Sequence, residues 1–112
     1  MEVWATGKYI RIGPRKARLV GRAIKGQDIE TALATLAFLP NRGARFLAKV
    51  VKSAVSNAEN NYGLNPGRLY VSRVSVDDGP RLKRLRAKSR GRPGWYKKRM
   101  SHITVVVDER EA

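Results

Sequence analysis

Ten of the chain's 24 Lys and Arg residues lie within residues 81–99, a stretch that contains no Asp or Glu. Guanidinium groups bind phosphate oxygens in pairs and stack on nucleobases, while ammonium groups act as point charges. The chemistry that this segment favours is recognition of a polyanion rather than catalysis. We name residues 81–99 the basic arm and predict that it is the main polyanion-binding surface of the chain.

The candidate phosphate-binding residues of the basic arm are its cations, and two aromatic residues accompany them. The cations are Arg81, Lys83, Arg84, Arg86, Lys88, Arg90, Arg92, Lys97, Lys98 and Arg99. Of the net charge of +15, these 19 residues carry +10, which leaves +5 for the other 93. Trp95 and Tyr96 supply faces for base stacking, although Trp95 could equally pack back on the rest of the domain.

No set of residues indicates an enzyme, a metal site or a cofactor. His102 is the only histidine and cysteine is absent, so neither a catalytic relay nor cysteine-ligated zinc is indicated. Adjacent Asp77 and Asp78 would point to opposite faces of a strand, which favours a turn or capping role over acid-base catalysis. An enzyme that acts on RNA would need a positioned base or metal, and is the weakest alternative.

Helices are expected to carry part of the positive charge outside the arm. Pro14 favours a helix over about residues 14–25, with an apolar face of Ala17, Val20 and Ile24. The opposite stripe, which either faces solvent or contacts phosphate, is Arg15, Arg18, Arg22 and Lys25.

Two further helices are predicted to complete the core. Asp28 is placed to cap a short helix that ends at Leu39-Pro40. A third helix, over about residues 41–61, has apolar residues at helical period and Gly63 in position to end it. We expect this third helix to be the central element of the core, with a structural role.

Residues 3–12, 69–76 and 102–107 are rich in β-favouring side chains and predict strands. In the second strand the apolar phase changes between Val71 and Val74, which indicates a bulge or burial on both faces. The Gly/Pro-rich residues 89–94 predict a hairpin tip, with each side of the hairpin about 30 Å long; disorder of the isolated arm is the alternative. The expected fold is α+β: three helices on a small, mainly antiparallel sheet with a long protruding β-hairpin.

We predict one domain over residues 1–112, with a globular part (1–80 and 100–112) and the basic arm (81–99). No run reaches the roughly 18 apolar residues of a membrane span, and the first residues lack the features of a secretory signal. The chain is therefore expected to be soluble and intracellular.

Five segments stand in order along the chain: residues 11–20 (RIGPRKARLV), 53–61 (SAVSNAENN), 76–80 (VDDGP), 86–92 (RAKSRGR) and 98–107 (KRMSHITVVV). The first resembles the opening motif, and the others resemble later motifs, of the large-subunit ribosomal protein twenty-two family in its compact bacterial form. Gly13 stands where the family usually has Ser, and Met100 where it usually has Thr.

The resemblance implies a cytoplasmic protein of the ribosome, present in one copy, that binds large-subunit ribosomal RNA beside neighbouring ribosomal proteins. It also implies a hairpin that lines the peptide exit tunnel, with its tip near the nascent peptide. The implied RNA contacts of the globular part are Arg11, Arg15, Lys16 and Arg18. His102 is not part of this implied set; since it has no evident metal partners or catalytic relay, we expect it to be either satisfied within the protein or in contact with RNA. The implied tunnel-facing tip is Arg90, Gly91, Arg92 and Pro93.

A competing hypothesis is an architectural DNA-binding protein. Basic β-arms with a proline near the tip, as at Pro93, can enter a minor groove and wedge base steps apart. Such arms usually belong to symmetric dimers on duplex DNA, whereas the ribosomal hypothesis predicts a preference for folded RNA.

Overall fold

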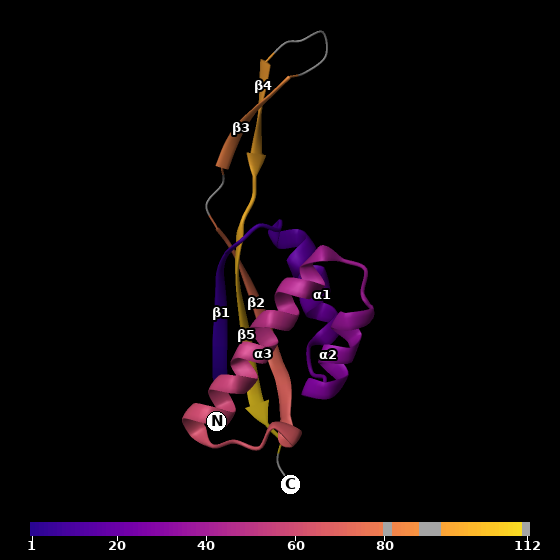
Figure 1. Cartoon of the computed structure of the whole chain (residues 1–112), viewed down its shortest axis with the longest axis vertical. Coiled ribbons are helices and arrows are strands. Elements are labelled where there is room, and N and C mark those ends of the chain that lie inside the picture. Colours follow the sequence, from indigo (N-terminus) through magenta and orange to yellow (C-terminus); the bar gives the residue numbers. More distant parts are fainter. Residues whose placement is uncertain (80–81, 88–92, 111–112) are drawn as a thin grey trace.

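The computed structural model of the chain describes residues 1–79, 82–87 and 93–110, with the backbone alone described for 82–87 and 93–98. The elements follow in the order β1 (Val3–Ile10), α1 (Pro14–Ile24), α2 (Ile29–Phe38), α3 (Arg42–Tyr62), a short 3₁₀ helix (Pro66–Arg68), β2 (Leu69–Asp78), β3 (Leu82–Ala87), β4 (Pro93–Lys98) and β5 (Ser101–Glu109). This arrangement confirms the predicted α+β class (Figure 1).

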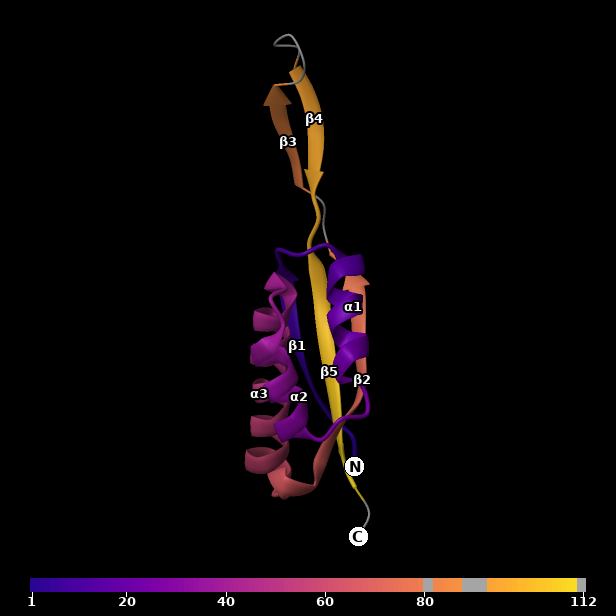
Figure 2. The same ribbon diagram turned by 90° about the vertical axis from the view of Figure 1, so that its right-hand side faces the viewer.

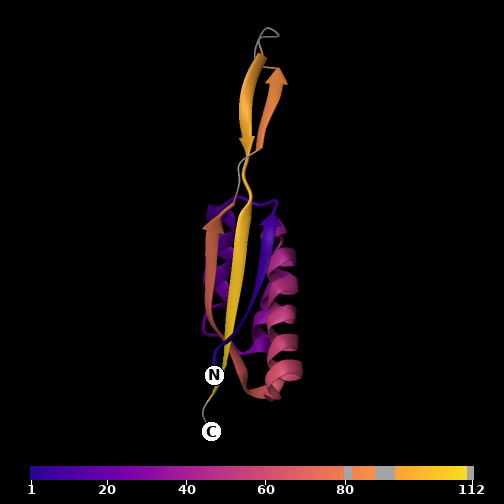
Figure 3. The same ribbon diagram turned by 90° about the vertical axis from the view of Figure 1, so that its left-hand side faces the viewer.

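β5 is the central strand of an antiparallel sheet with the order β1-β5-β2. All three α-helices cover the same face, so Figure 2 shows them in front of the sheet and Figure 3 shows the strands in front of the helices. α3 packs on β1 and β5, α1 packs on β2, and α2 packs against α3. Among the described residues, the other face of the sheet carries no helix.

The helix boundaries follow from backbone chemistry. Pro14 is the first residue of α1, where its missing N–H costs nothing. α3 ends at Gly63, which adopts the left-handed conformation with φ 65°. Asp28 does precede α2, but the predicted capping bond is absent; its carboxylate instead accepts a hydrogen bond of 2.6 Å from Arg110 Nε.

The core is built around α3, as its pattern predicts. Leu47, Val51 and Ala54 have no exposed surface and pack with residues of β1, α1, β2 and β5. α1 approaches the sheet closely at Gly21, where an added Cβ would lie 2.9 Å from Val74 Cγ1. Small residues therefore let two helices lie directly on the strands.

Two outer strands contain irregularities. The pairing of β2 with β5 shifts between Val71 and Arg73, which confirms the bulge that the apolar phase change predicts. The pairing of β1 with β5 shifts between Gly7 and Ile10, and in this stretch Tyr9 has a left-handed φ of 57°. The Tyr9 N–H donates to His102 Nδ1 at 3.1 Å, which fixes this strained residue against β5.

β3 and β4 form a separate antiparallel ladder of six pairs, from Leu82 opposite Lys98 to Ala87 opposite Pro93. The ladder projects beyond the end of the sheet at which β2 finishes and β5 starts (Figures 1 and 3). The molecule is 64 Å long. Each described strand accounts for about 20 Å. The predicted tip residues Arg90, Gly91 and Arg92 lie outside the described residues.

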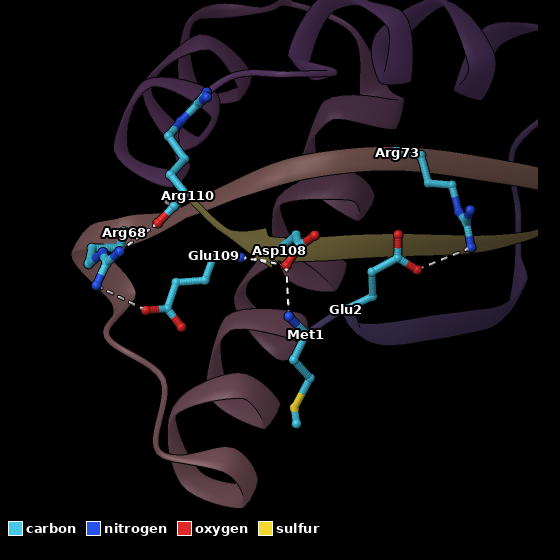
Figure 4. Close-up of polar contacts among 7 residues, drawn as sticks. All are labelled: Met1, Glu2, Arg68, Arg73, Asp108, Glu109 and Arg110. Carbon is cyan, nitrogen blue, oxygen red and sulfur yellow. Dashed lines mark hydrogen bonds and ion pairs between the residues drawn. The ribbon is translucent and has the colours of Figure 1, made fainter. Parts of the chain in front are cut away.

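Acidic side chains are paired mainly at the end of the domain that carries the chain termini, opposite the arm (Figures 1 and 4). Glu109 pairs with Arg68 at 3.4 Å, and Glu2 with Arg73 at 3.7 Å. Asp108 Oδ1 accepts hydrogen bonds from the Glu109 N–H at 2.8 Å and from the Met1 ammonium at 3.1 Å. Several of the chain's acidic side chains are therefore paired far from the arm and do not neutralise its positive charge.

Val51→Asp should prevent cooperative folding or lower the free energy of unfolding by more than about 4 kcal/mol, because a carboxylate would be buried without a partner. Thermal melting followed by circular dichroism measures the effect. Ser53→Asp, on the exposed face of the same helix, is the matched control and should change stability by no more than about 0.5 kcal/mol. A near-wild-type melting temperature for Val51→Asp would show that the core is wrongly assigned.

Asp108 should contribute to stability in a pH-dependent manner. The backbone hydrogen bond from Glu109, and then the Met1 ammonium, hold the pKa of Asp108 below its ordinary value of 3.8. This contribution is complete above that value and is lost as the pH falls through the lower folded pKa. Asp108→Asn should therefore lower stability at pH 7 and flatten its decline under acid, as followed by urea unfolding. Asp77→Asn is the control, and an acid profile unchanged by Asp108→Asn would contradict the assignment.

Candidate nucleic-acid interface

A groove of about 680 Å³ lies at the base of the arm. It is formed where the β1–α1 loop, the first turn of α1, the start of α3 and the chain returning from β4 meet. Its lining residues are Arg11, Ile12, Gly13, Arg15, Lys16, Leu19, Asn41, Arg42, Gly43 and Arg99. Half of these ten are cations, so the groove is a positively charged concavity.

Two helices begin at this groove and run away from the arm (Figure 1). The first turns of α1 and α3 contain no acid, and neither Gly13 nor Asn41 caps its helix with a side chain. A helix N-terminus carries partial positive charge and unpaired N–H groups that favour anions. Arg15, Lys16 and Arg42 place further positive charge there, an arrangement that a bound phosphate would stabilise.

Three of the four globular residues implied by the resemblance meet at the groove. Arg11, Arg15 and Lys16 are exposed and share its wall with Arg99 from the arm. Arg18 lies elsewhere, since its Nη2 donates to the Val76 carbonyl at 2.9 Å and so ties α1 to β2. It lines a separate depression of about 340 Å³ together with Arg22, Lys25 and residues of β2. The predicted α1 stripe is thus divided between two surfaces.

Arg42 is a groove residue that sequence reasoning missed. It is exposed and opens α3, the helix for which the sequence predicts only a structural role. The signal was present, because cations recur at positions 42, 45, 49 and 52, which share one side of a helix. What the pattern could not show is that the start of α3 lies beside the start of α1.

The base of the arm is fixed by three contacts. Ser101 is fully buried, and its hydroxyl donates to the Ile12 carbonyl at 2.7 Å. The Gly79 N–H donates to the Met100 carbonyl at 2.8 Å, which continues the pairing of β2 with β5 toward the arm. Arg99 Nη2 lies 3.3 Å from Asp78 Oδ1 in an exposed ion pair. The strands that lead into the arm are therefore tied to the loop that carries Arg11.

Asp77 and Asp78 do not occupy the predicted turn or capping positions. Both lie within β2, opposite His102 and Ser101 of β5 respectively. The turn interpretation was wrong because β2 extends to Asp78, beyond the predicted end of the strand at residue 76. Asp78 serves instead to pair with Arg99 at the base of the arm.

His102 lies on the face of the sheet away from the helices, since its neighbours Ser101 and Ile103 are buried on the helix side. Its Nδ1 accepts the Tyr9 N–H, and the two rings meet edge to face with centroids 4.9 Å apart. Only Nε2 is left to bind another group. His102 is thus separate from the groove and has a structural contact of its own.

The arm residues that the structure describes are placed by backbone register. Lys83 lies opposite Lys97, Arg84 opposite Tyr96, and Leu85 opposite Trp95. Arg86 pairs with Gly94, Lys98 with Leu82, and Pro93 opens β4. The candidate residues Arg81, Lys88, Arg90, Gly91 and Arg92 lie outside the described residues.

The described part of the chain contains no group of three or more His, Asp or Glu residues that could hold a metal ion. Within that part, none of the helices has the length and apolar character needed to cross a membrane.

Comparison with known proteins gives a consistent match. Residues 5–108 match the model of the family described as Ribosomal protein L22p/L17e. The chain is 54% identical over 110 residues to "Large ribosomal subunit protein uL22" of Thermotoga sp. (strain RQ2), which covers 98% of this chain and 69% of that protein. A protein of the same name from Thermoanaerobacter sp. (strain X514) is 48% identical over 111 residues, 99% of this chain and 100% of that protein. A third, from Lacticaseibacillus casei (strain BL23), is 51% identical over 108 residues, 96% of this chain and 92% of its own.

Ser101→Ala should lower the free energy of unfolding by about 1–3 kcal/mol, because it leaves the buried Ile12 carbonyl without its hydrogen-bond donor. Urea unfolding measures the change. Ser75→Ala removes an exposed hydroxyl from β2 and should have an effect below about 0.5 kcal/mol. Equal effects of the two substitutions would mean that the Ser101 hydrogen bond does not stabilise the base of the arm.

Proposed function

The chain belongs to the ribosomal protein L22p/L17e family, and we propose from this premise that it is a structural constituent of the large ribosomal subunit that binds ribosomal RNA. The main support for RNA binding is the cationic groove at the base of the arm, where two helix N-termini and five cationic side chains face one concavity. Such a site needs a partner with dense negative charge.

In this proposal the globular part holds the RNA backbone at the groove. Arg11, Arg15 and Lys16 bind phosphates from one side, and Arg99 binds them from the arm side. Four of the five ion pairs found in the described part involve neither Arg11, Arg15, Lys16 nor Arg99; the fifth joins Arg99 to exposed Asp78. Arg18 positions α1 on β2 and keeps further N–H donors for phosphate. In this role the protein neutralises phosphate charge and positions RNA segments, and it catalyses no reaction.

The basic arm is proposed to run inward through ribosomal RNA and to line the peptide exit tunnel. The support is its charge of +10 and the projection of the β3–β4 ladder away from the sheet (Figure 1). Its Lys and Arg residues would bind RNA along the flanks, with Trp95 and Tyr96 as candidate stacking partners. Residues 90–93 would lie near the nascent peptide.

We further propose that residues 1–80 and 100–112 fold as the globular part of a single domain, present once per ribosome beside neighbouring ribosomal proteins. The hydrophobic core found among the described side chains is contributed by β1, α1, α2, α3, β2 and β5. The arm can therefore be shortened without removing any of these core residues.

Replacement of residues 81–99 by a short turn should leave the melting transition nearly unchanged but weaken the salt dependence of binding to large-subunit ribosomal RNA. The slope of log K against log salt should fall by roughly 0.7–0.9 for every phosphate that the full arm neutralises and the short turn cannot reach. Filter binding over a salt series measures this slope. An unchanged slope would refute the role of the arm.

Random duplex DNA, tested at the same salt concentrations, distinguishes the architectural alternative. The ribosomal proposal predicts that the wild-type chain binds folded ribosomal RNA more tightly than the duplex. Equal affinity for the two at physiological salt would favour a DNA-binding architectural protein instead.

A further inference from the structure

A second row of cations follows the exposed side of α3. Arg45, Lys49 and Lys52 are exposed and continue the spacing that begins at Arg42, with intervals of three, four and three residues. At about 1.5 Å per residue, the four positions extend over about 15 Å of the helix. We name Arg42, Arg45, Lys49 and Lys52 the α3 stripe.

The charges of the α3 stripe are not balanced by acidic side chains in the described part of the chain. None of the ion pairs among the described residues involves the stripe. The only acid on α3 is Glu59, seven residues beyond Lys52 near the opposite end of the helix. Like charges three and four residues apart repel, and cations near a helix N-terminus oppose the helix dipole. In the free protein this arrangement is electrostatically unfavourable.

The α3 stripe is continuous with the groove at the base of the arm. Arg42 lines that groove and also a shallow depression of about 530 Å³ that includes Arg45, Lys49 and Lys52. A ligand that occupies the groove can therefore continue along α3 without leaving a positively charged surface. The stripe runs away from the arm, as α3 does in Figure 1.

The shape of the surface indicates what kind of polyanion it fits. Surfaces that bind single strands combine a cationic groove with aromatic faces on which bases stack. The aromatic residue beside the α3 stripe, Phe46, is only partly exposed and lies under the Arg42 guanidinium, whose Cζ is 5.8 Å from the ring centroid. Cations along a straight helix suit a regular phosphate backbone, as an RNA duplex presents.

We propose that the α3 stripe is a second RNA-binding surface, which holds the sugar-phosphate backbone of a double-helical RNA segment that enters the groove at Arg42. This inference rests on the proposed function and extends it from the arm end of the protein to the outer side of α3. The contacts are to phosphate and carry no base specificity.

The test is a triple variant, Arg45→Gln, Lys49→Gln and Lys52→Gln, of the full-length chain. Its binding to a short RNA duplex is compared with that of the wild type over a salt series. Removal of the cations that neutralise two to three phosphates should reduce the slope of log K against log salt by roughly 2. The variant should melt at the same temperature as the wild type or higher, because repulsion along α3 is relieved.

The matched control removes the same charge elsewhere: Lys8→Gln, Arg68→Gln and Arg73→Gln, all exposed and outside the α3 stripe and the groove. It should leave the slope for duplex RNA close to that of the wild type. Single-stranded RNA of equal length and poly-glutamate are the competing probes.

Two results would overturn the inference while leaving RNA binding by the family intact. One is a wild-type slope for the α3 triple variant, and the other is a weakening confined to single-stranded RNA or to poly-glutamate. Absence of salt-dependent RNA binding by the wild type would instead refute the proposed function itself.

Discussion

Positive charge accumulates at the base of the arm, and the rest of the fold has to accommodate the resulting repulsion. The N-termini of α1 and α3 and the side chains of Arg11, Arg15 and Arg42 all face the same groove. Their mutual repulsion must be offset by packing elsewhere, because few acids lie nearby and several are paired at the far end of the domain (Figure 4). A bound polyanion would relieve this repulsion, and the relief would strengthen its binding.

The apolar core supplies the packing that offsets the repulsion. α3 lies on β1 and β5 through small and branched side chains with no exposed surface, and α1 approaches β2 closely at Gly21. The buried Ser101 then connects β5 to the loop that carries Arg11, so the central strand positions both the groove and the arm. In the proposed function, folding and RNA recognition therefore depend on the same strand, β5.

Local signals were sufficient for most of the fold. The apolar period of α3, the start at Pro14, the end at Gly63 and the phase change in β2 are all properties of neighbouring residues, and the structure has the expected element at each. Contacts between distant segments were not predictable in this way. Arg42 belongs to the groove only because two helices begin side by side. The Asp28 carboxylate, instead of capping α2, binds Arg110 from the other end of the chain. The Tyr9 contact with His102 likewise depends on the pairing of β1 with β5.

Co-sedimentation with the large ribosomal subunit measures whether the cations of the groove hold the protein on ribosomal RNA. The wild-type chain and a variant with Arg11, Arg15 and Lys16 replaced by Gln are each incubated with subunits that lack the protein, washed at high salt and quantified. The wild type should remain at about one copy per subunit, because many phosphate contacts resist the wash together, and the variant should be partly released. Complete release of the wild type, or equal retention of the two, would show that the groove does not hold the protein on the subunit.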